Sequence, residues 1–360
     1  MTENPYKSLP DYAFWRRSVA DVPWNEVDPV VRGAFKISKT DKVATAGSCF
    51  AQHIARYLSN SGFNYYVSEQ AHPIIPAHIA KGFGYGEFTA RYGNIYTARQ
   101  LNQLFDRAYG DLTPKENIWR NEDGDYIDPY RPNIQPGGFK CELELEVDRK
   151  QHLAAVREAF EELDVFVFTL GLTESWVSNE DGMAFPLCPG VVAGKFDPKK
   201  YSFKNFSVSE VTEDMADFVN KLLKVNPSAK VILTVSPVPL IATMEDRHVL
   251  TSTTYSKSVL RIAAEEISTK FDSVAYFPSF EIITGSSSRG RYFAQDCRSV
   301  IENGVSHVMG LFLKHYTDDK ADETPPTKAA DSKLSESDVH LREMERLVEV
   351  NCDEVALDQK

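Results

Sequence analysis

Ser48 is a candidate nucleophile because of its position in the chain. A short apolar run at 43–46 precedes it, Gly47 permits an unusual backbone angle, and apolar residues then recur at helical spacing as far as Leu58. This pattern predicts a buried strand, a tight turn and a helix, and it puts Ser48 at the strand's carboxyl end, where open α/β sheets bind ligands. A serine in that place can either cap the helix or attack a substrate. Cys49 is interpreted as a core residue, because its side chain should point away from Ser48.

The elements that would position Ser48 alternate between strands and helices. Further strands are predicted at 62–68, 164–169, 230–236 and 274–277. Helices are predicted at 97–109 with Thr97 as N-cap, and at 152–163, 210–225, 255–270 and 303–315. This alternation predicts the α/β class, with a flavodoxin-like three-layer α/β/α sandwich around a parallel sheet. The stretch at 178–206, rich in proline and glycine, is predicted to be irregular.

The chain divides into one large domain with a segment on either side. Residues 1–40 carry aromatic residues among prolines, and we expect them to form an arm that packs on the domain. The domain spans 41–316, with a large insertion at 71–150 on the carboxyl edge of the sheet. Residues 317–337 have almost nothing to bury and are predicted to be a flexible linker. The last segment, 338–360, is predicted to form a short helix and tail, which would dock on the domain or on a second copy of the chain.

Composition excludes several classes of function. The 360 residues carry 52 acidic and 40 basic side chains, and this net charge of -12 argues against binding to nucleic acid. No stretch is long and apolar enough for a signal peptide or a membrane span. The 5 cysteines are scattered and odd in number, which indicates neither a disulfide framework nor a zinc site. We therefore expect a cytoplasmic protein with no metal or other cofactor.

The segment at 46–51, Ala-Gly-Ser-Cys-Phe-Ala, resembles the signature of the GSCFA family, a bacterial group similar to the SGNH esterases and lipases. Further segments resemble blocks of the family in the same order, at 92–97, 168–176, 233–240, 255–261 and 276–281. The resemblance implies an SGNH-like fold in which Ser48 forms an acyl-enzyme. It also implies that the substrate is a small-molecule or carbohydrate ester.

The resemblance further implies residues that would assist Ser48. Its backbone N–H, together with Gly171 and Thr173, would form the oxyanion hole, with threonine in the place of the asparagine of the superfamily pattern. The late Asp-x-x-His block of the superfamily corresponds to Asp296 and Ser299 here. Asp296 therefore keeps the place of the orienting acid, whereas a serine stands in the place of the histidine base.

Three histidines are candidates for the missing base. His248 lies in a loop that leaves the carboxyl end of the predicted strand at 230–236, as a catalytic loop should. His307 lies about one turn into the predicted final helix. His53 follows Ser48 by five residues and therefore lies on another face of its helix. We favour His248, then His307, then His53.

Arg131 and Glu174 are the candidate substrate-binding residues. Arg131 either pairs with a carboxylate or binds an anionic or sugar group, and Glu174 follows the predicted strand at 164–169. Acyl transfer from a thioester such as coenzyme A to a glycan is an alternative to hydrolysis, and it would call for a positive patch including Arg91, Arg99 and Arg131. A binding module with a decayed site is an alternative of another class, favoured by the missing late histidine.

Overall fold

A central sheet of four parallel strands forms the core of the computed structural model, which describes residues 4–48, 50–318 and 353–358. In spatial order the strands are β1 (Val43–Gly47), β4 (Val165–Leu170), β8 (Lys230–Val235) and β9 (Val274–Tyr276). Every residue of β1 and β4 is buried, as expected for parallel strands that are covered on both faces.

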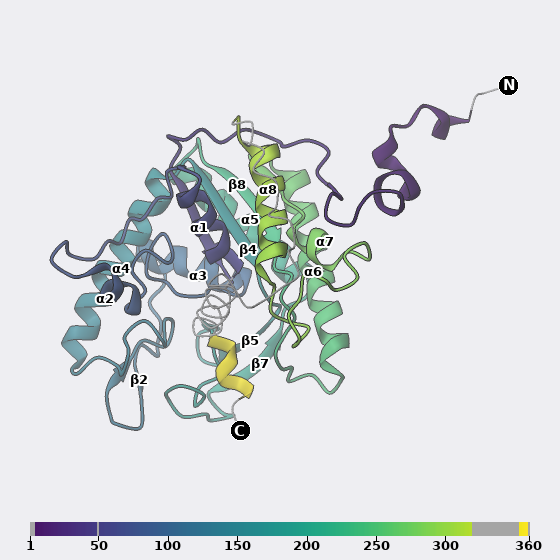
Figure 1. The fold of residues 1–360 in the computed structure, drawn as a ribbon. Helices are drawn as coiled ribbons and strands as arrows, with labels where there is room; N and C mark the ends of the chain where they lie inside the picture. Colours follow the sequence, from purple (N-terminus) through teal and green to yellow (C-terminus); the bar gives the residue numbers. More distant parts are fainter. Residues whose placement is uncertain (1–3, 49, 319–352, 359–360) are drawn as a thin grey trace, which may run out of the picture.

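Helices cover both faces of this sheet (Figure 1). On one face lie α1 (Phe50–Asn60), α7 (Ser279–Thr284) and α8 (Glu302–Tyr316). On the other lie α3 (Ala98–Tyr109), α4 (Glu142–Glu162), α5 (Val208–Val225) and α6 (Val249–Lys270). Val43 packs with the first group and its neighbour Ala44 with the second, because side chains alternate along a strand. The predicted α/β class and three-layer sandwich are confirmed.

Local sequence signals place several helix ends correctly. Thr97 caps α3 as predicted, since its side chain accepts the Gln100 N–H while the Gln100 side chain accepts the Thr97 N–H. Other helices begin before the predicted residue: α4 begins at Glu142 rather than 152, and α6 at Val249 rather than 255. The first apolar residues of α4, at 143, 145 and 147, alternate with glutamates, and four Ser or Thr residues follow Leu250 in α6, so helical periodicity does not reveal these starts.

The predicted strand at 62–68 is reduced to a single bridge between Val43 and Tyr65. The Tyr66 N–H donates to the Val43 carbonyl, but two residues along β1 the Thr45 N–H donates to the Thr89 hydroxyl instead. Residues of the insertion therefore complete the cover of this edge of the sheet.

A second, antiparallel sheet occupies part of the stretch that was predicted to be irregular. Its strands are β6 (Ala184–Phe185), β5 (Glu174–Ser178) and β7 (Tyr201–Asn205), in that spatial order. The insertion contributes α2 (Ala77–Gly82) and a hairpin of β2 (Trp119–Arg120) and β3 (Tyr126–Ile127). Trp119, Tyr130 and Phe185 form a small core that joins the two regions.

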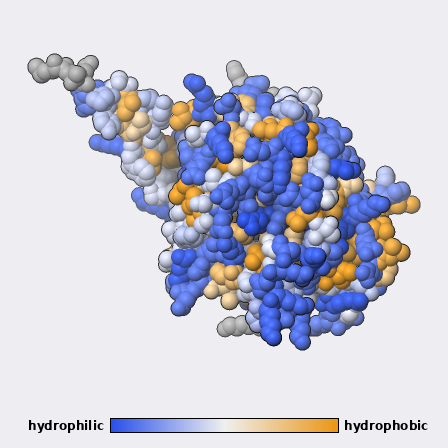
Figure 2. Space-filling view, turned by 180° about the vertical axis from the view of Figure 1, so that it is seen from behind, coloured by the Kyte–Doolittle hydropathy of each residue, from blue (hydrophilic) through white to orange (hydrophobic). Residues whose placement is uncertain are grey.

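The N-terminal arm packs on the domain only in its second half. Residues 5–20 form short helical turns without a buried residue, and Tyr6 and Trp15 are 66% and 69% exposed. Figures 1 and 2 show this part standing away from the body. Trp24 and Phe35, by contrast, pack against Tyr292 and Tyr316. The expectation of a packed arm therefore does not hold for its first half, where no regular spacing gathers the aromatic residues on one face.

Some expectations fall outside the described residues. They concern the packing of Cys49, nearly all of the linker at 317–337, and most of the C-terminal segment, of which the structure describes a 3-10 helix at Asp353–Asp358. Within the described residues, no helix is long and apolar enough to cross a membrane.

Candidate functional site

The backbone of the turn at Ser48 is held between β4 and a loop of the insertion. The Ser48 N–H lies 3.3 Å from the Thr169 carbonyl oxygen, and the Ile95 N–H donates to the Gly47 carbonyl at 2.9 Å. Gly47 has a φ of 133°, and a Cβ on it would lie 2.3 Å from the Thr169 oxygen. Only glycine fits there, so the close contact with β4 fixes the direction in which the chain enters α1.

The Ser48 hydroxyl is buried and has no hydrogen-bond partner among the described residues. Two neighbouring atoms share that condition, Nε2 of Gln52 one helical turn further on and Oγ1 of Thr169 on β4. Native proteins leave few buried polar atoms unpaired, so this group needs an explanation, and a ligand site is one. Ser236 provides a contrast, because it follows β8 as Ser48 follows β1, yet its hydroxyl accepts the Val238 N–H at 3.3 Å.

Gln52 also lines a cavity of about 450 Å³ between α1 and the insertion. Asn94, Tyr130, Arg131 and Ile134 form other parts of its wall. Small-molecule sites have volumes of about 300–1,000 Å³, so this cavity has a suitable size. Asn94 belongs to the same loop as Ile95, which bonds to Gly47, and it therefore reaches the cavity from beside the Ser48 turn.

The backbone and side-chain donors expected in the oxyanion hole already have acceptors. The Ser48 N–H faces β4, and the Gly171 N–H donates to the Tyr96 carbonyl at 3.0 Å. Thr173 is fully buried, and its hydroxyl donates to Oδ1 of Asn205 at 2.7 Å. Gly171 does lie beside the serine, because a Cβ built on it would be 3.2 Å from the Ser48 Cβ. The structure thus brings Ser48 and Gly171 together and directs the Thr173 hydroxyl elsewhere.

His248 is an exposed residue that caps α6 at the carboxyl edge of the sheet. Its Nδ1 accepts the Leu250 N–H at 3.1 Å. A neutral ring in this arrangement carries its proton on Nε2, which cannot then accept the proton of a serine. The helix cap would have to open before His248 served as a base for Ser48.

His307 and His53 lie on helices of the α1–α8 face. Nδ1 of His307 is 2.5 Å from the Tyr292 hydroxyl oxygen, and burial lowers its pKa. Burial, together with the charge of Arg56, lowers the pKa of His53 to about 4. Both rings are therefore neutral at pH 7. No histidine in the described part of the chain forms a hydrogen bond with Ser48.

Asp296 and Glu174 take part in local contacts. Oδ1 of Asp296 accepts the backbone N–H groups of Arg298 and Ser299, and its Oδ2 accepts the Ser299 hydroxyl at 2.6 Å. The serine in the place of the superfamily histidine thus closes a turn with the aspartate, which orients no imidazole here. Glu174 accepts the Thr243 hydroxyl at 2.7 Å, and burial raises its pKa.

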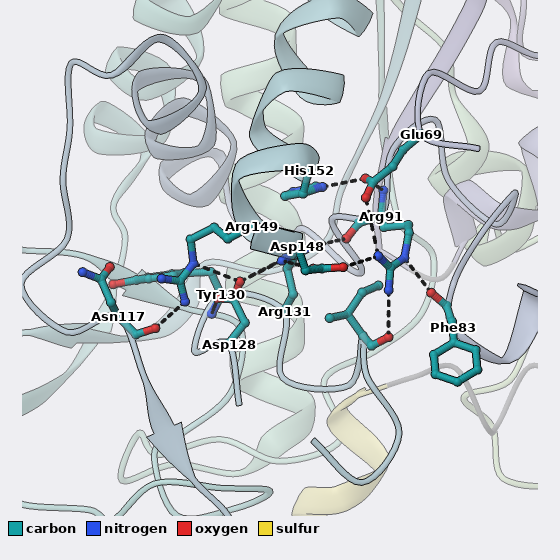
Figure 3. Close-up of polar contacts among 11 residues, drawn as sticks. Glu69, Phe83, Arg91, Asn117, Asp128, Tyr130, Arg131, Asp148, Arg149 and His152 are labelled. Carbon is teal, nitrogen blue, oxygen red and sulfur yellow. Dashed lines mark hydrogen bonds and ion pairs between the residues drawn. The ribbon is translucent and has the colours of Figure 1, made fainter. Parts of the chain in front are cut away.

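Arg131 belongs to a buried ion-pair cluster of the insertion and α4 (Figure 3). Its guanidinium contacts Asp128 at 3.0 Å and Asp148 at 2.8 Å. Arg91 pairs with Asp148 at 2.7 Å, and Arg149 with Asp128 at 3.3 Å. Burial alone would raise the pKa of Asp128, but the neighbouring guanidinium groups hold it well below its usual range. Arg131 is therefore paired with carboxylates, although it also lines the cavity.

The Glu69–His152 pair adjoins this cluster. Nδ1 of His152 lies 2.7 Å from Oε2 of Glu69, and both side chains are 1% exposed (Figure 3). Burial opposes ionisation of Glu69, but His152 and Arg131 outweigh it and lower its pKa to about 2. Burial and the charge of Arg131 lower the pKa of His152 to about 4. At pH 7 the ring is therefore neutral, donates from Nδ1 and keeps a lone pair on Nε2, which has no partner among the described residues.

Sequence reasoning missed Gln52, Asn94 and the Glu69–His152 pair as parts of a site. Gln52 stands one helical turn after Ser48, and Asn94 lies within the family-like segment at 92–97, so both carried a local signal. Glu69 and His152 lie 83 positions apart, and no spacing rule connects them. Of the described residues, no group of three or more His, Cys, Asp or Glu side chains could hold a metal ion.

Comparison with known proteins gives one result. A family profile matches residues 42–312, which is more than half of the chain, and its description is the GSCFA family. No curated protein matches the chain. The matched range runs from just before β1 into α8, so it contains the sheet, the Ser48 turn and the cavity. The chain therefore belongs to the GSCFA family.

Proposed function

We propose that this chain is a serine-dependent acyl hydrolase that forms a covalent acyl-enzyme on Ser48. One observation carries the proposal: the Ser48 hydroxyl is buried at the end of β1, one helical turn before the cavity-lining Gln52, and has no hydrogen-bond partner among the described residues. A serine that served only as a helix cap would accept a backbone N–H of the first turn. Ser48 does not accept one from the described residues, which favours a chemical role over a capping role.

In the proposed reaction, Oγ of Ser48 attacks the carbonyl carbon of an ester, and its proton passes to an imidazole. The bond to the leaving alcohol then breaks, the alcohol takes that proton, and water hydrolyses the acyl-enzyme. The N-terminus of α1 favours the negative charge that develops at the carbonyl oxygen. The side-chain amide of Asn94 is of a type that donates to such an oxyanion.

We assign the role of base to His248. It is the exposed histidine on the loop between β8 and α6, at the same edge of the sheet as Ser48. The assignment requires the bond between Nδ1 and the Leu250 N–H to open when substrate binds. Hydrolysis of a small polar ester, such as an acylated carbohydrate, and transfer of the acyl group to a glycan both proceed through this intermediate.

Ligand binding without turnover is the second candidate function. Two observations favour it: no imidazole in the described residues bonds to Ser48, and Asp296 is engaged with Ser299.

A fluorophosphonate probe and p-nitrophenyl acetate distinguish the two functions. The wild-type protein should react with the probe at Ser48 and hydrolyse the ester, and Ser48→Ala should abolish both activities. Ser236→Ala is the matched control, because Ser236 is also a buried serine directly after a strand of the sheet. It should leave both intact. His248→Gln should lower turnover by about 10²–10⁴-fold.

Ester turnover that survives in Ser48→Ala would refute the proposal. A wild-type protein that neither reacts with the probe nor hydrolyses esters of several chain lengths would instead identify a binding protein.

A further inference from the structure

A second cavity, of about 30 Å³, adjoins the larger one, and its wall includes two basic side chains, those of Arg107 and His152, that the proposed reaction does not use. The two cavities share wall residues, namely Tyr92, Asn94, Tyr130, Arg131 and Pro186. Arg107 of α3 and His152 of α4 line only the small one. Its volume is roughly that of one water molecule in the liquid, so it has room for a single small functional group.

Arg107 is a buried cation that no carboxylate of the described residues contacts. Its residue is 8% exposed, and its guanidinium carbon lies 4.2 Å from the centre of the Tyr130 ring. In the described part of the chain, its guanidinium forms no hydrogen bond or ion pair, although Asp128 attracts it from a longer distance. Burial lowers the pKa of Arg107 to about 10, so it remains charged at pH 7. A buried charge that lacks a direct partner is costly.

Among the arginines of this region and the carboxylates that contact them, the positive charges exceed the negative charges by one. The described carboxylates that pair with the arginines here are Glu69, Asp128 and Asp148. The guanidinium groups are those of Arg91, Arg107, Arg131 and Arg149. Because His152 is neutral at pH 7 and the other three arginines contact the three carboxylates, the excess falls on Arg107, which faces the small cavity.

We propose that Arg107 binds a carboxylate group of the ligand in the small cavity. A planar carboxylate matches the fork of the guanidinium with two parallel hydrogen bonds, and its single charge balances the excess. Phosphate and sulfate are larger than a carboxylate and fit the volume less well. The larger cavity shares wall residues with the small one and is also lined by Gln52, so the proposal extends to one molecule that holds its anionic end at Arg107 and its other end near Ser48. The substrate class is then an ester with a free carboxylate, a step that rests on the proposed function.

His152 supplies an independent readout of this binding. The lone pair on Nε2 repels a carboxylate unless the ring takes up a proton. Glu69 favours the protonated ring, Arg131 and Arg107 oppose it, and the edge of the Tyr92 ring packs against it. A carboxylate that offsets the charge of Arg107 moves this balance toward the protonated ring. Binding at a pH of about 5 should therefore be accompanied by proton uptake at His152, which appears as the difference from the proton that partly protonated acetate itself releases when its anion binds.

Isothermal titration of the full-length protein with sodium acetate, against sodium chloride at equal ionic strength, tests the proposal. Acetate should bind to the wild-type protein, and Arg107→Gln should weaken its binding by about tenfold or more. Arg107→Lys keeps the charge but not the fork, so its affinity should fall between the two. Arg120→Gln is the matched control, because Arg120 also lies over a tyrosine ring, that of Tyr126, but is exposed. It should bind acetate as the wild type does.

Titrations in two buffers with different ionisation enthalpies measure the protons taken up, and His152→Gln should remove that uptake. Equal acetate affinity in the wild type and in folded Arg107→Gln would overturn the proposal. Chloride that binds as tightly as acetate would also overturn it, because the site would then be a halide site. Acetate binding that persists in Ser48→Ala, when wild-type protein shows no ester turnover, would support the carboxylate site and refute only the hydrolase.

Discussion

The Ser48 turn and the ion-pair cluster of the insertion differ in whether their buried polar groups have partners. At the turn, the Ser48 hydroxyl and the Gln52 amide nitrogen have no partner among the described residues. In the cluster, each carboxylate contacts at least one guanidinium, and Asp128 and Asp148 each contact two. Both regions border the same cavity. Burial is therefore common to both regions, but the ionised groups of the cluster pair with one another, whereas the neutral Ser48 hydroxyl and Gln52 amide nitrogen have no partner among the described residues.

The largest effect on stability should come from removing a carboxylate from the ion-pair cluster. Asp128→Ala leaves Arg131 with Asp148 alone and Arg149 with no carboxylate among the described residues, and should lower the free energy of unfolding by about 3–5 kcal/mol. Asp21→Ala is the control, because its ion pair with Arg16 is exposed. That change should lower the free energy of unfolding by less than about 1 kcal/mol. Urea unfolding at pH 7 measures both, and equal losses would show that the cluster contributes no more than a surface pair.

A smaller effect should appear in the way the free energy of unfolding depends on pH. The pKa of His152 is about 4 in the folded protein, whereas the ordinary value is 6.5. Between these two pH values the ring is protonated in the unfolded chain and neutral in the folded chain. Stability should therefore fall as the pH falls from 6.5 to 4, and His152 accounts for up to roughly 3 kcal/mol of that fall.

Replacing the histidine should flatten this dependence. Unfolding of His152→Gln, followed from pH 7 to 4.5, should show a shallower slope than that of the wild type. His53→Gln removes the corresponding contribution on the other face of the sheet, since the pKa of His53 is also about 4. An unchanged slope in His152→Gln would mean that this ring is protonated in the folded protein.

The smallest effect should distinguish the two serines that follow strands. Ser48→Ala removes a buried hydroxyl without a partner, so stability should stay the same or rise by about 1 kcal/mol. Ser236→Ala removes a bonded hydroxyl and should lower stability by about 1 kcal/mol. Thermal or urea unfolding would measure both changes. A loss in Ser48→Ala as large as that in Ser236→Ala would indicate that the Ser48 hydroxyl has a structural partner in solution.

Features encoded by neighbouring residues were predictable from the sequence. The strand, turn and helix around Ser48 follow from an apolar run, a glycine and helical spacing, and the Thr97 cap follows from its position before a periodic segment. These signals need only the interactions of a few consecutive residues. They were sufficient for the order of the main strands and helices, and for the sandwich.

Features that depend on distant pairing were not predictable. The strands β5 and β6 carry no clear two-residue period, β7 alternates only over residues 201–204, and only the pairing of these strands with one another makes them a sheet. The Glu69–His152 pair and the isolation of Arg107 depend on which side chains the folded insertion brings together. A reading of separate segments could name Arg131 as a candidate but not its partners Asp128 and Asp148.

The cover over the outer side of β1 has a consequence for any attempt to trim this protein. An uncovered strand at the margin of a sheet is a template to which other chains add, and it promotes aggregation. Here the backbone around Tyr66 and the hydroxyl of Thr89 occupy hydrogen-bonding positions along that strand. A shortened version that lacks these flanking residues would expose this strand edge directly beside Ser48, and would be expected to precipitate rather than to fold as a smaller domain.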